Sequence, residues 1–230
     1  MSRDNHFLDA ICSEDIGNIA PLLACINLNR GDRLSEDGEK LHSVYLPIDS
    51  ILSVITVMKS GQQVESRTIG RESGYGLLHA LGSQITYERM EVQVSGRAWR
   101  IPLEDLRRVA QQSSTLTHAI VAHGQATIVQ CAQGVACNAL HSVEHRLCRW
   151  LLMTQDRLGA DVLPLTQEHL SIMLGVQRTT VTAVASEMQR RGHISYARGK
   201  IRILDRAKLK QEACECYDAI TNSVRTMLQP

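Results

Sequence analysis

The apolar positions divide the chain into stretches of different periodicity. Residues 7–28 carry apolar side chains at helical spacing, which predicts a helix. From about residue 30 to 103, short apolar runs alternate with turns such as "NRGDRL" and "SEDGEK". One of these runs, 51–58, is strand-length and rich in β-branched residues. Several short strands so close together predict an antiparallel barrel or sandwich.

No proline lies between Pro102 and Pro164, and this stretch is predicted to be helical, with breaks near Ser113–Ser114 and around Cys137–Asn138. Between the breaks, a seam of residues recurs every three or four positions, flanked by alanines that permit close helix approach. We expect this helix to pack on its own copy in a homodimer, the alternative being an internal core helix. The expected interface residues are Leu116, Ile120, His123, Thr127, Gln130 and Gly134.

The pattern after Pro164 predicts a helix, a glycine turn and a second helix. Thr166 is a natural N-cap, Gly175 supplies the turn, and the second helix begins near Gln177. That helix buries a stripe at helical spacing but opens on polar residues: Arg178, Thr179, Thr180 and Thr182. A helix that enters the major groove by its N-terminus needs such residues to reach bases and phosphates. "HISYARGKIRILD" then predicts a β-hairpin with basic residues at its tip.

Charge strengthens this interpretation. The whole chain has a net charge of +1, but residues 164–210 hold nine basic and three acidic residues, a local charge of +6. Such asymmetry indicates that one part of the chain meets a polyanion, although a solvated basic face is an equal alternative on charge alone. No apolar run approaches the length of a membrane span, and the first 17 residues lack a signal-peptide core. We therefore expect a cytoplasmic protein with no membrane partner.

These motifs resemble the Crp/Fnr family of bacterial transcription regulators over nearly the whole chain. "LTQEHLSIMLGVQRTTVTAVASEMQRRGHISYARGKIRILD" is similar to the winged helix-turn-helix of that family. "YLPIDSILSVITVMKSGQQVESRTIGRESGYGLL" through "RAWRIP" resembles its cyclic-nucleotide-binding-type β-roll. The resemblance implies an α+β protein with an N-terminal antiparallel, jelly-roll-like β-roll, a long dimerisation helix and a C-terminal winged helix-turn-helix. The expected boundaries are 1–112 for the effector domain, 113–138 for the dimerisation helix and 139–230 for the DNA-binding domain.

By the same resemblance, the partners are double-stranded DNA, a second copy of the chain and RNA polymerase. Thr166 and Gln167 are expected at backbone phosphates, and Thr180 also holds a phosphate. Gln177, Arg178, Thr179 and Thr182 face the groove, while Arg198 and Lys200 of the wing add cations. Where the family's best-known recognition helices carry glutamate and a second arginine, this chain has Thr179 and Ala183. It should therefore read a different half-site.

The effector pocket also departs from the cyclic-AMP-binding members, which hold the phosphate with Gly-Glu and Arg-Ser pairs. Here Gly76 is followed by Leu77, and Arg89 is followed by Met90. A buried anion needs those hydrogen bonds, so ordinary cyclic AMP is not expected as the effector. No cofactor is predicted, and haem or another small ligand stays open as the effector.

Other chemistry has weaker support. Cys12 and Cys25 are too few for an N-terminal iron–sulfur cluster, and Cys214-x-Cys216 is a weak metal signal without matching ligands, so no metal site is assigned. His141 and His145 are spaced i, i+4, but packing or surface roles are favoured. No nucleophile–base motif or phosphate-binding loop supports an enzyme. The rival function is an effector-binding module whose winged helix contacts protein rather than DNA.

Overall fold

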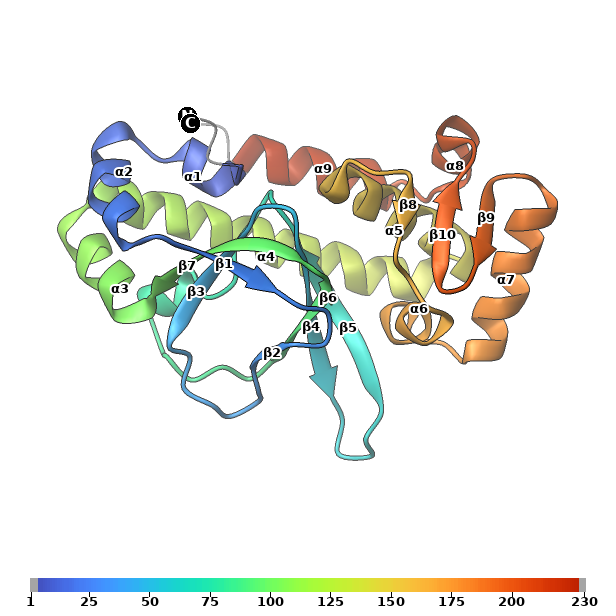
Figure 1. Cartoon of the computed structure of the whole chain (residues 1–230), viewed down its shortest axis with the longest axis horizontal. Helices are drawn as coiled ribbons and strands as arrows, with labels where there is room; N and C mark the ends of the chain where they lie inside the picture. Colours follow the sequence, from blue (N-terminus) through green and yellow to red (C-terminus); the bar gives the residue numbers. More distant parts are fainter. Residues whose placement is uncertain (1–3, 228–230) are drawn as a thin grey trace. The chain divides into compact units, whose positions relative to one another are not determined.

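The structure of the protein is a computed structural model, which describes residues 4–227 (Figure 1). These residues form two compact units. The first contains the described residues up to Ile55, residues 67–130 and those from Asn222 onward, and the second contains residues 56–66 and 131–221. The functional boundaries expected from the sequence, at 112 and 138, stay a prediction.

The first unit is built around two antiparallel sheets, as the alternating pattern of residues 30–103 predicted. One sheet has the strand order β1-β7-β3 and the other β2-β6-β4-β5, with residues 56–66 at the tip of the β4–β5 hairpin grouped with the second unit. The strands are β1 (Ala24–Leu28), β2 (Arg33–Ser35), β3 (Ser43–Pro47), β4 (Ile51–Val57), β5 (Gln63–Ile69), β6 (Arg89–Val94) and β7 (Gly96–Pro102). The accompanying helices are α1 (His6–Ala10), α2 (Ser13–Ile19), η1 (Ala20–Leu22), η2 (Leu78–Ala80) and α3 (Leu103–Gln112).

The expectation of a helix over residues 7–28 was only partly correct. Two short helices and a 3-10 turn occupy residues 6–22, but residues 24–28 form strand β1, which pairs with β7 in the register Ala24↔Arg100 to Leu28↔Gly96. Pro21 lies in the 3-10 turn that ends at Leu22, and from Ala24 onward the backbone groups are satisfied by the sheet. Tertiary pairing therefore overrode the local helical periodicity.

Helix α4 (Ser114–Leu140) follows α3 after the break predicted near Ser113–Ser114. The Ser113 hydroxyl accepts a hydrogen bond from the Leu116 N–H at 3.1 Å, which caps the start of the new helix. The second break lies at residues 141–142 rather than at Cys137–Asn138, because Ser142 is the N-cap of the next helix. The i, i+4 spacing of His141 and His145 suggested a single helix, but His141 lies between α4 and α5 and His145 lies in α5.

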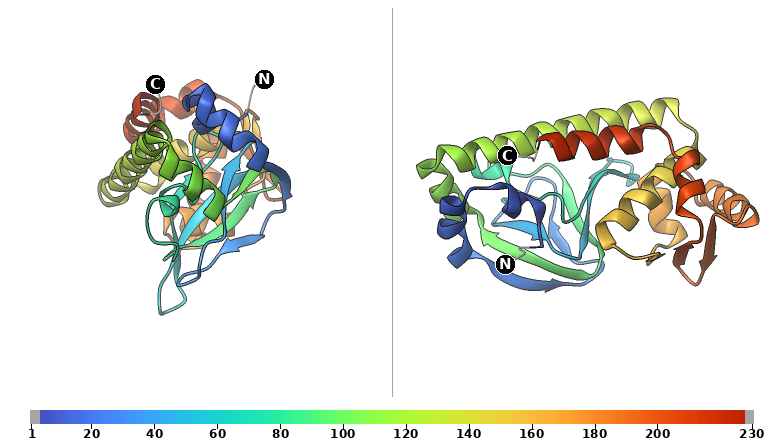
Figure 2. Two further views of the ribbon diagram at one scale, coloured as in Figure 1. Left: turned by 90° about the vertical axis from the view of Figure 1, so that its left-hand side faces the viewer. Right: turned by 90° about the horizontal axis from the view of Figure 1, so that it is seen from above.

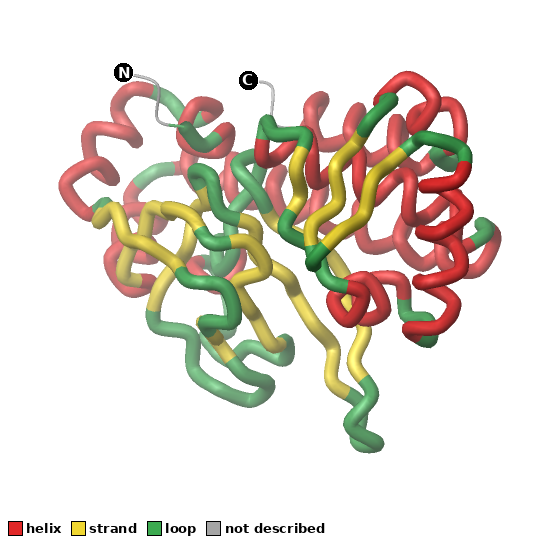
Figure 3. The backbone as a smooth tube through the Cα atoms, turned by 45° about the vertical axis from the view of Figure 1, so that its right-hand side comes forward, coloured by secondary structure: helices red, strands yellow, loops and turns green. Residues whose placement is uncertain are grey.

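The second unit contains helices and a three-stranded antiparallel sheet with the order β8-β10-β9 (Figure 3). Its strands are β8 (Val162–Leu163), β9 (Ile194–Ala197) and β10 (Lys200–Ile203). Its helices are α5 (Val143–Leu158), α6 (Gln167–Leu174), α7 (Arg178–Arg190) and α8 (Arg206–Glu212), and it also includes the end of α4 and the start of α9 (Cys216–Met227). Among the described residues, no helix combines the length and hydropathy that crossing a bilayer requires.

Candidate nucleic-acid interface

Helices α6 and α7 form the helix-turn-helix that the sequence predicted. Thr166 is the N-cap of α6, and its hydroxyl accepts a hydrogen bond from the His169 N–H at 3.3 Å. Gly175 ends α6 with a left-handed φ of 63°, a conformation that costs glycine little and other residues more. Because the turn is this tight, α7 starts only three residues later, at Arg178.

Helix α7 has one buried face and one exposed face. Val181, Ala185 and Met188 are at most 1% exposed, which fixes the helix against the rest of the unit. Its N-cap, Gln177, makes no side-chain capping bond, and the first helical residues, Arg178 and Thr179, are exposed. The N-terminal N–H groups of α7 thus lie beside exposed polar side chains, an arrangement suited to an anion.

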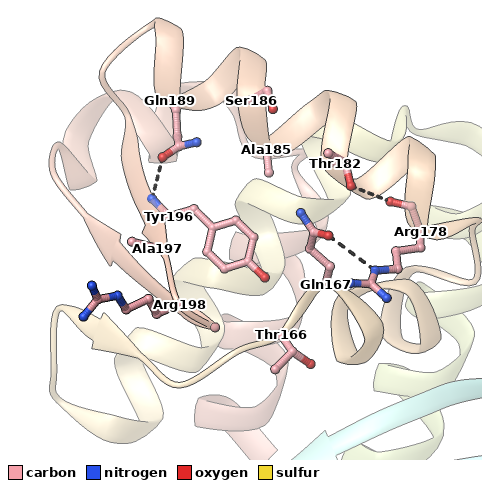
Figure 4. A pocket seen from close by; sticks show the side chains of 11 residues that line it. Thr166, Gln167, Arg178, Thr182, Ala185, Ser186, Gln189, Tyr196, Ala197 and Arg198 are labelled. Carbon is pink, nitrogen blue, oxygen red and sulfur yellow. Dashed lines mark hydrogen bonds between the residues drawn. The ribbon is translucent and has the colours of Figure 1, made fainter.

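An open depression of about 430 Å³ lies between α7, the start of α6 and the β9–β10 hairpin (Figure 4). Arg178, Thr182, Ser186 and Gln189 line it from α7, and Tyr196 lines it from β9. The remaining lining residues are Thr166, Gln167, Ala185, Ala197, Arg198 and Gly199. A depression walled by amides, hydroxyls and guanidinium groups can donate and accept hydrogen bonds along a nucleic-acid backbone or base edge.

Hydrogen bonds within the depression hold its side chains in place (Figure 4). Arg178 Nε donates to Gln167 Oε1 at 3.4 Å, and the Thr182 hydroxyl donates to the Arg178 carbonyl at 3.0 Å. The Tyr196 N–H donates to Gln189 Oε1 at 2.6 Å, which connects the hairpin to α7. Burial raises the pKa of the Tyr196 hydroxyl, so this group stays protonated and can donate a hydrogen bond at neutral pH.

The β9–β10 hairpin turns through two residues, as the sequence indicated. Lys200 pairs with Ala197, and the intervening Arg198 and Gly199 have φ values of 50° and 71°. Positive φ at both central positions defines the tight turn that matches strand twist, but it strains a non-glycine residue by roughly 1–2 kcal/mol. The Arg198 side chain points away from the depression (Figure 4). The turn therefore presents a cation at the hairpin tip despite that cost.

Ion pairing separates the basic residues of this unit into two groups. Five of the nine in residues 164–210 pair with acidic side chains: Arg190 with Glu187, Arg191 with Glu144, Glu187 and Glu212, Arg206 with Asp156, Lys208 with Asp205 and Lys210 with Asp218. Within residues 4–227, Arg178, Arg198, Lys200 and Arg202 have no acidic partner, and all four are exposed. Within residues 164–210, the cations without an acidic partner thus lie on α7 and the hairpin.

Two arginines fix the helix-turn-helix within its unit. Arg146 of α5 is buried and donates to the Leu174 carbonyl at the end of α6 at 2.9 Å, and to Asn138 Oδ1 of α4 at 2.8 Å. Arg191, which follows α7, pairs with Glu144 of α5 and with Glu212 of α8. Neither residue was recognised from the sequence as a support, because its partners lie far along the chain.

The structure brings together five of the expected DNA contacts around the depression: Thr166, Gln167, Arg178, Thr182 and Arg198. Gln177, Thr179 and Lys200 are exposed beside it, and Thr180 is half-buried, with its N–H bonded to the Gln177 carbonyl at 3.0 Å. Ser186, Gln189 and Tyr196 also line the depression and were not expected from the sequence. Continuing the i, i+4 series from Arg178 through Thr182 would have reached Ser186.

The expected effector-pocket residues are already engaged within the first unit. Leu77 and Met90 are 1% and 0% exposed and belong to its apolar core. Arg89 Nε donates to both carboxylate oxygens of Glu36, at 2.9 and 3.0 Å. Gly76 has a φ of 91°, and a Cβ atom there would meet Leu41 at 2.8 Å. The one cation of this set is thus neutralised by a carboxylate.

The expected dimer seam on α4 requires a correction. Leu116 and Ile120 are fully buried in the core of their own unit, and His123 is 5% exposed. His123 Nε2 lies 2.6 Å from the Ser73 hydroxyl and accepts the Gly74 N–H at 3.3 Å, and burial lowers the pKa of this histidine to about 4. Thr127, Gln130 and Gly134 are half-buried. The first half of the assigned face therefore packs on the chain itself, while a role of Thr127, Gln130 and Gly134 in an interface stays a prediction.

The exposed face of α4 lies elsewhere and has a spacing of its own. Three large apolar residues on it are Val121, Ile128 and Val135, which are 43%, 67% and 72% exposed, and successive members of this set are seven residues apart. Leu140, at the end of α4, is also exposed but lies outside this spacing. A second set of exposed residues lies three residues before or four residues after each member of the first: His118, Gln125, Ala132 and Ala139. A stripe repeating every seven residues is the pattern of a helix that pairs with another helix.

Helices α6 and α7 and the β9–β10 hairpin that follows them have the arrangement of a winged helix-turn-helix. Residues 145–212 match the family model of the Crp-like helix-turn-helix domain. The chain as a whole has the fold of the Crp/Fnr-type transcriptional regulators, with a helix-turn-helix DNA-binding domain, as the resemblance in the sequence had implied. Comparison of the sequence with curated proteins gives no match.

Solved structures carry the same fold at low sequence identity. FixK2 from Bradyrhizobium japonicum is 14% identical with a TM-score of 0.72, covering 84% of this chain and 98% of that one. A CRP-family transcriptional regulator from Thermus thermophilus is 17% identical with a TM-score of 0.70, covering 82% and 96%. The c-di-GMP-responsive regulator CLP from Xanthomonas campestris is 14% identical with a TM-score of 0.68, covering 84% and 100%.

Proposed function

We propose that this protein is a homodimeric, sequence-specific DNA-binding regulator that reads a palindromic operator through α7. The observation that carries the proposal is the set of four exposed cations without acidic partners in the described residues, Arg178, Arg198, Lys200 and Arg202, on α7 and the hairpin. Arg178 faces a base, where a guanidinium can bond guanine bidentately, and Thr182 and Gln167 flank it. Arg198 and Lys200 lie over phosphates.

The homodimer forms through the exposed stripe on α4, not through the face first expected. Val121, Ile128 and Val135 occupy one heptad position, and small or polar residues occupy the other. β-branched residues at such positions favour close pairing of two helices. A dimer with two-fold symmetry presents two copies of α7, and these fit half-sites about one helical turn apart.

Ordinary cyclic AMP is not the effector. Arg89 is bound to Glu36, and Leu77 and Met90 fill apolar core positions where a cyclic phosphate needs hydrogen-bond donors. A thermal-shift titration with cyclic AMP tests this, because a ligand that binds only the native state raises the melting temperature. We expect no shift. A concentration-dependent rise would contradict the assignment, and haem and other nucleotides belong in the same panel.

Enrichment of random duplexes on the purified full-length protein tests DNA reading. The expected result is a two-fold-symmetric motif, with relaxed preference at one base pair of each half-site when Arg178→Ala replaces the wild type. The matched control is Arg190→Ala, since Arg190 is an exposed α7 arginine already paired with Glu187. If no motif is enriched at low salt, the rival function, a winged helix that contacts protein, is favoured.

A further inference from the structure

Four metal-binding side chains meet where α4 ends and α9 begins. Cys137, His141, Cys214 and Cys216 place one ligand atom each within 4.8 Å of all the others, and this set is called the Cys3His cluster below. Cys137 and His141 are one helical turn apart, so they face the same side. The segment before α9 lies alongside the last turns of α4 (Figure 2), which adds the two other thiols.

The distances in the Cys3His cluster fit a tetrahedral zinc site. The sulfurs of Cys137 and Cys214 are 3.5 Å apart, and the sulfur of Cys216 is 3.5 Å from His141 Nδ1. Zinc bonds of about 2.3 Å to sulfur and about 2.0 Å to nitrogen place tetrahedral ligands roughly 3.6–3.8 Å apart. The two distances above already match this spacing, and the other ligand atoms, all within 4.8 Å of one another, need to approach by no more than about 1 Å. A disulfide, by contrast, needs the two sulfurs at about 2.0 Å, and all seven cysteines are free thiols.

The groups around the Cys3His cluster are those that support a metal site. His141 Nε2, the nitrogen that faces away from Cys216, lies 3.6 Å from the Glu215 carboxylate, which can orient the imidazole. Gln133 Nε2 donates to the sulfur of Cys216 at 3.0 Å, a bond that strengthens when the sulfur is a thiolate.

Burial indicates a structural rather than a catalytic site. Cys137 and Cys216 are fully buried and Cys214 is 6% exposed. Four protein ligands leave no open coordination position for water or substrate, which is the arrangement of structural zinc. Three buried cysteines without a metal would contribute only as small apolar residues.

We infer that the Cys3His cluster binds one structural Zn²⁺ ion, which joins the C-terminal end of α4 to the N-terminal end of α9. The bound ion fixes the segment 213–216 to α4 within the second unit. This inference does not depend on DNA binding, so the two can fail separately.

Metal analysis of the full-length protein, purified under reducing conditions without added metal or chelator, tests the inference. We expect about one zinc per chain by mass spectrometry of the metal. Replacement of zinc by Co²⁺ should give intense tetrahedral d–d bands and a thiolate-to-cobalt charge-transfer band. A strong chelator should lower the melting temperature, and added Zn²⁺ should restore it. These measurements need no variant, so they remain decisive where a substitution prevents folding.

Variants locate the site. Cys216→Ala and Cys137→Ala should lose the metal and the effect of the chelator, and His141→Ala should shift the cobalt bands while keeping the charge-transfer band. Cys148→Ala is the matched control, because Cys148 is equally buried, on α5, but lies outside the cluster. The inference is wrong if the reduced protein holds no zinc and gains no stability from Zn²⁺ or Co²⁺. It is equally wrong if metal binding persists in both cysteine variants, or if a Cys137–Cys214 disulfide forms in place of the metal site.

Discussion

Lys200 offers the sharpest test of how the hairpin meets DNA. It is exposed at the first position of β10 and pairs with Ala197 across the turn, and it has no acidic partner among the described residues. Lys200→Gln removes the charge and keeps a side chain of similar length on an exposed strand position. The fold should be unaffected, while a phosphate contact is lost from each subunit.

The expected change in the salt dependence of DNA binding follows from counterion release. The logarithm of the binding constant falls with the logarithm of salt concentration by about 0.9 per phosphate neutralised, so two lost contacts per dimer reduce the slope by about 1.8. Between about 50 and 200 mM salt, the advantage of the wild type over the variant should therefore shrink by roughly 12-fold. Fluorescence anisotropy of a labelled duplex of arbitrary sequence measures this without knowledge of the operator.

Lys210→Gln is the matched control, because Lys210 is an exposed lysine of α8 whose ammonium lies 3.3 Å from the Asp218 carboxylate. Its salt dependence should equal that of the wild type. If Lys200→Gln also keeps the wild-type slope, the hairpin does not contact phosphate, and the placement of the wing on DNA is refuted.

Three further predictions concern other parts of the molecule. Arg178→Ala should cost about 1–3 kcal/mol at one base pair of each half-site, measured by competition with single-base operator variants; equal losses on every sequence would make Arg178 a phosphate contact instead. Ile128→Glu should weaken the dimer by about 3–6 kcal/mol, since two apolar side chains leave the interface; sedimentation should show monomers, whereas Leu204→Glu, at another exposed apolar residue, should not change the assembly. Because burial lowers the pKa of His123 to about 4, the unfolded chain binds its proton first as pH falls. Stability should therefore decline from about pH 6.5 to about pH 4, by about 3 kcal/mol in all, and chemical denaturation of His123→Gln should show a smaller decline across that window.

The sequence was most informative where the signals are local. Thr166 as a cap, Gly175 in the turn and Arg198-Gly199 at the hairpin tip each act on neighbouring backbone, so their structural roles could be predicted from a few residues. The exposure of the first residues of α7 could likewise be predicted from their polar side chains. The alternating apolar and polar positions also predicted the strands of the β-roll. Strand β1 was wrongly predicted as helix, because it is a strand only through its pairing with β7, which lies far along the chain.

Contacts between distant segments could not be predicted in this way. The helical period of α4 predicts that one face of the helix is buried and another exposed. Which face packs on the β-roll depends on partners such as Ser73 and Gly74, about fifty residues earlier in the chain. The Cys3His cluster could not be predicted for the same reason, since Cys137 and Cys214 are 77 positions apart in the chain. The pair Cys214-x-Cys216 was visible in the sequence, but its matching ligands were not.

The two hydrogen bonds of Arg146 make the orientation of α6 conditional on that of α4. One guanidinium, itself buried, donates to Asn138 on the last turn of α4 and to the final carbonyl of α6, and its bond to that carbonyl is shielded from water. A rotation of the last turn of α4 about its axis would displace Asn138. The Arg146 side chain would then either lose one of its two hydrogen bonds or keep both and move α6 together with α4. If α6 and α7 contact DNA as proposed, a rotation of the last turn of α4 would be passed through Arg146 to α6.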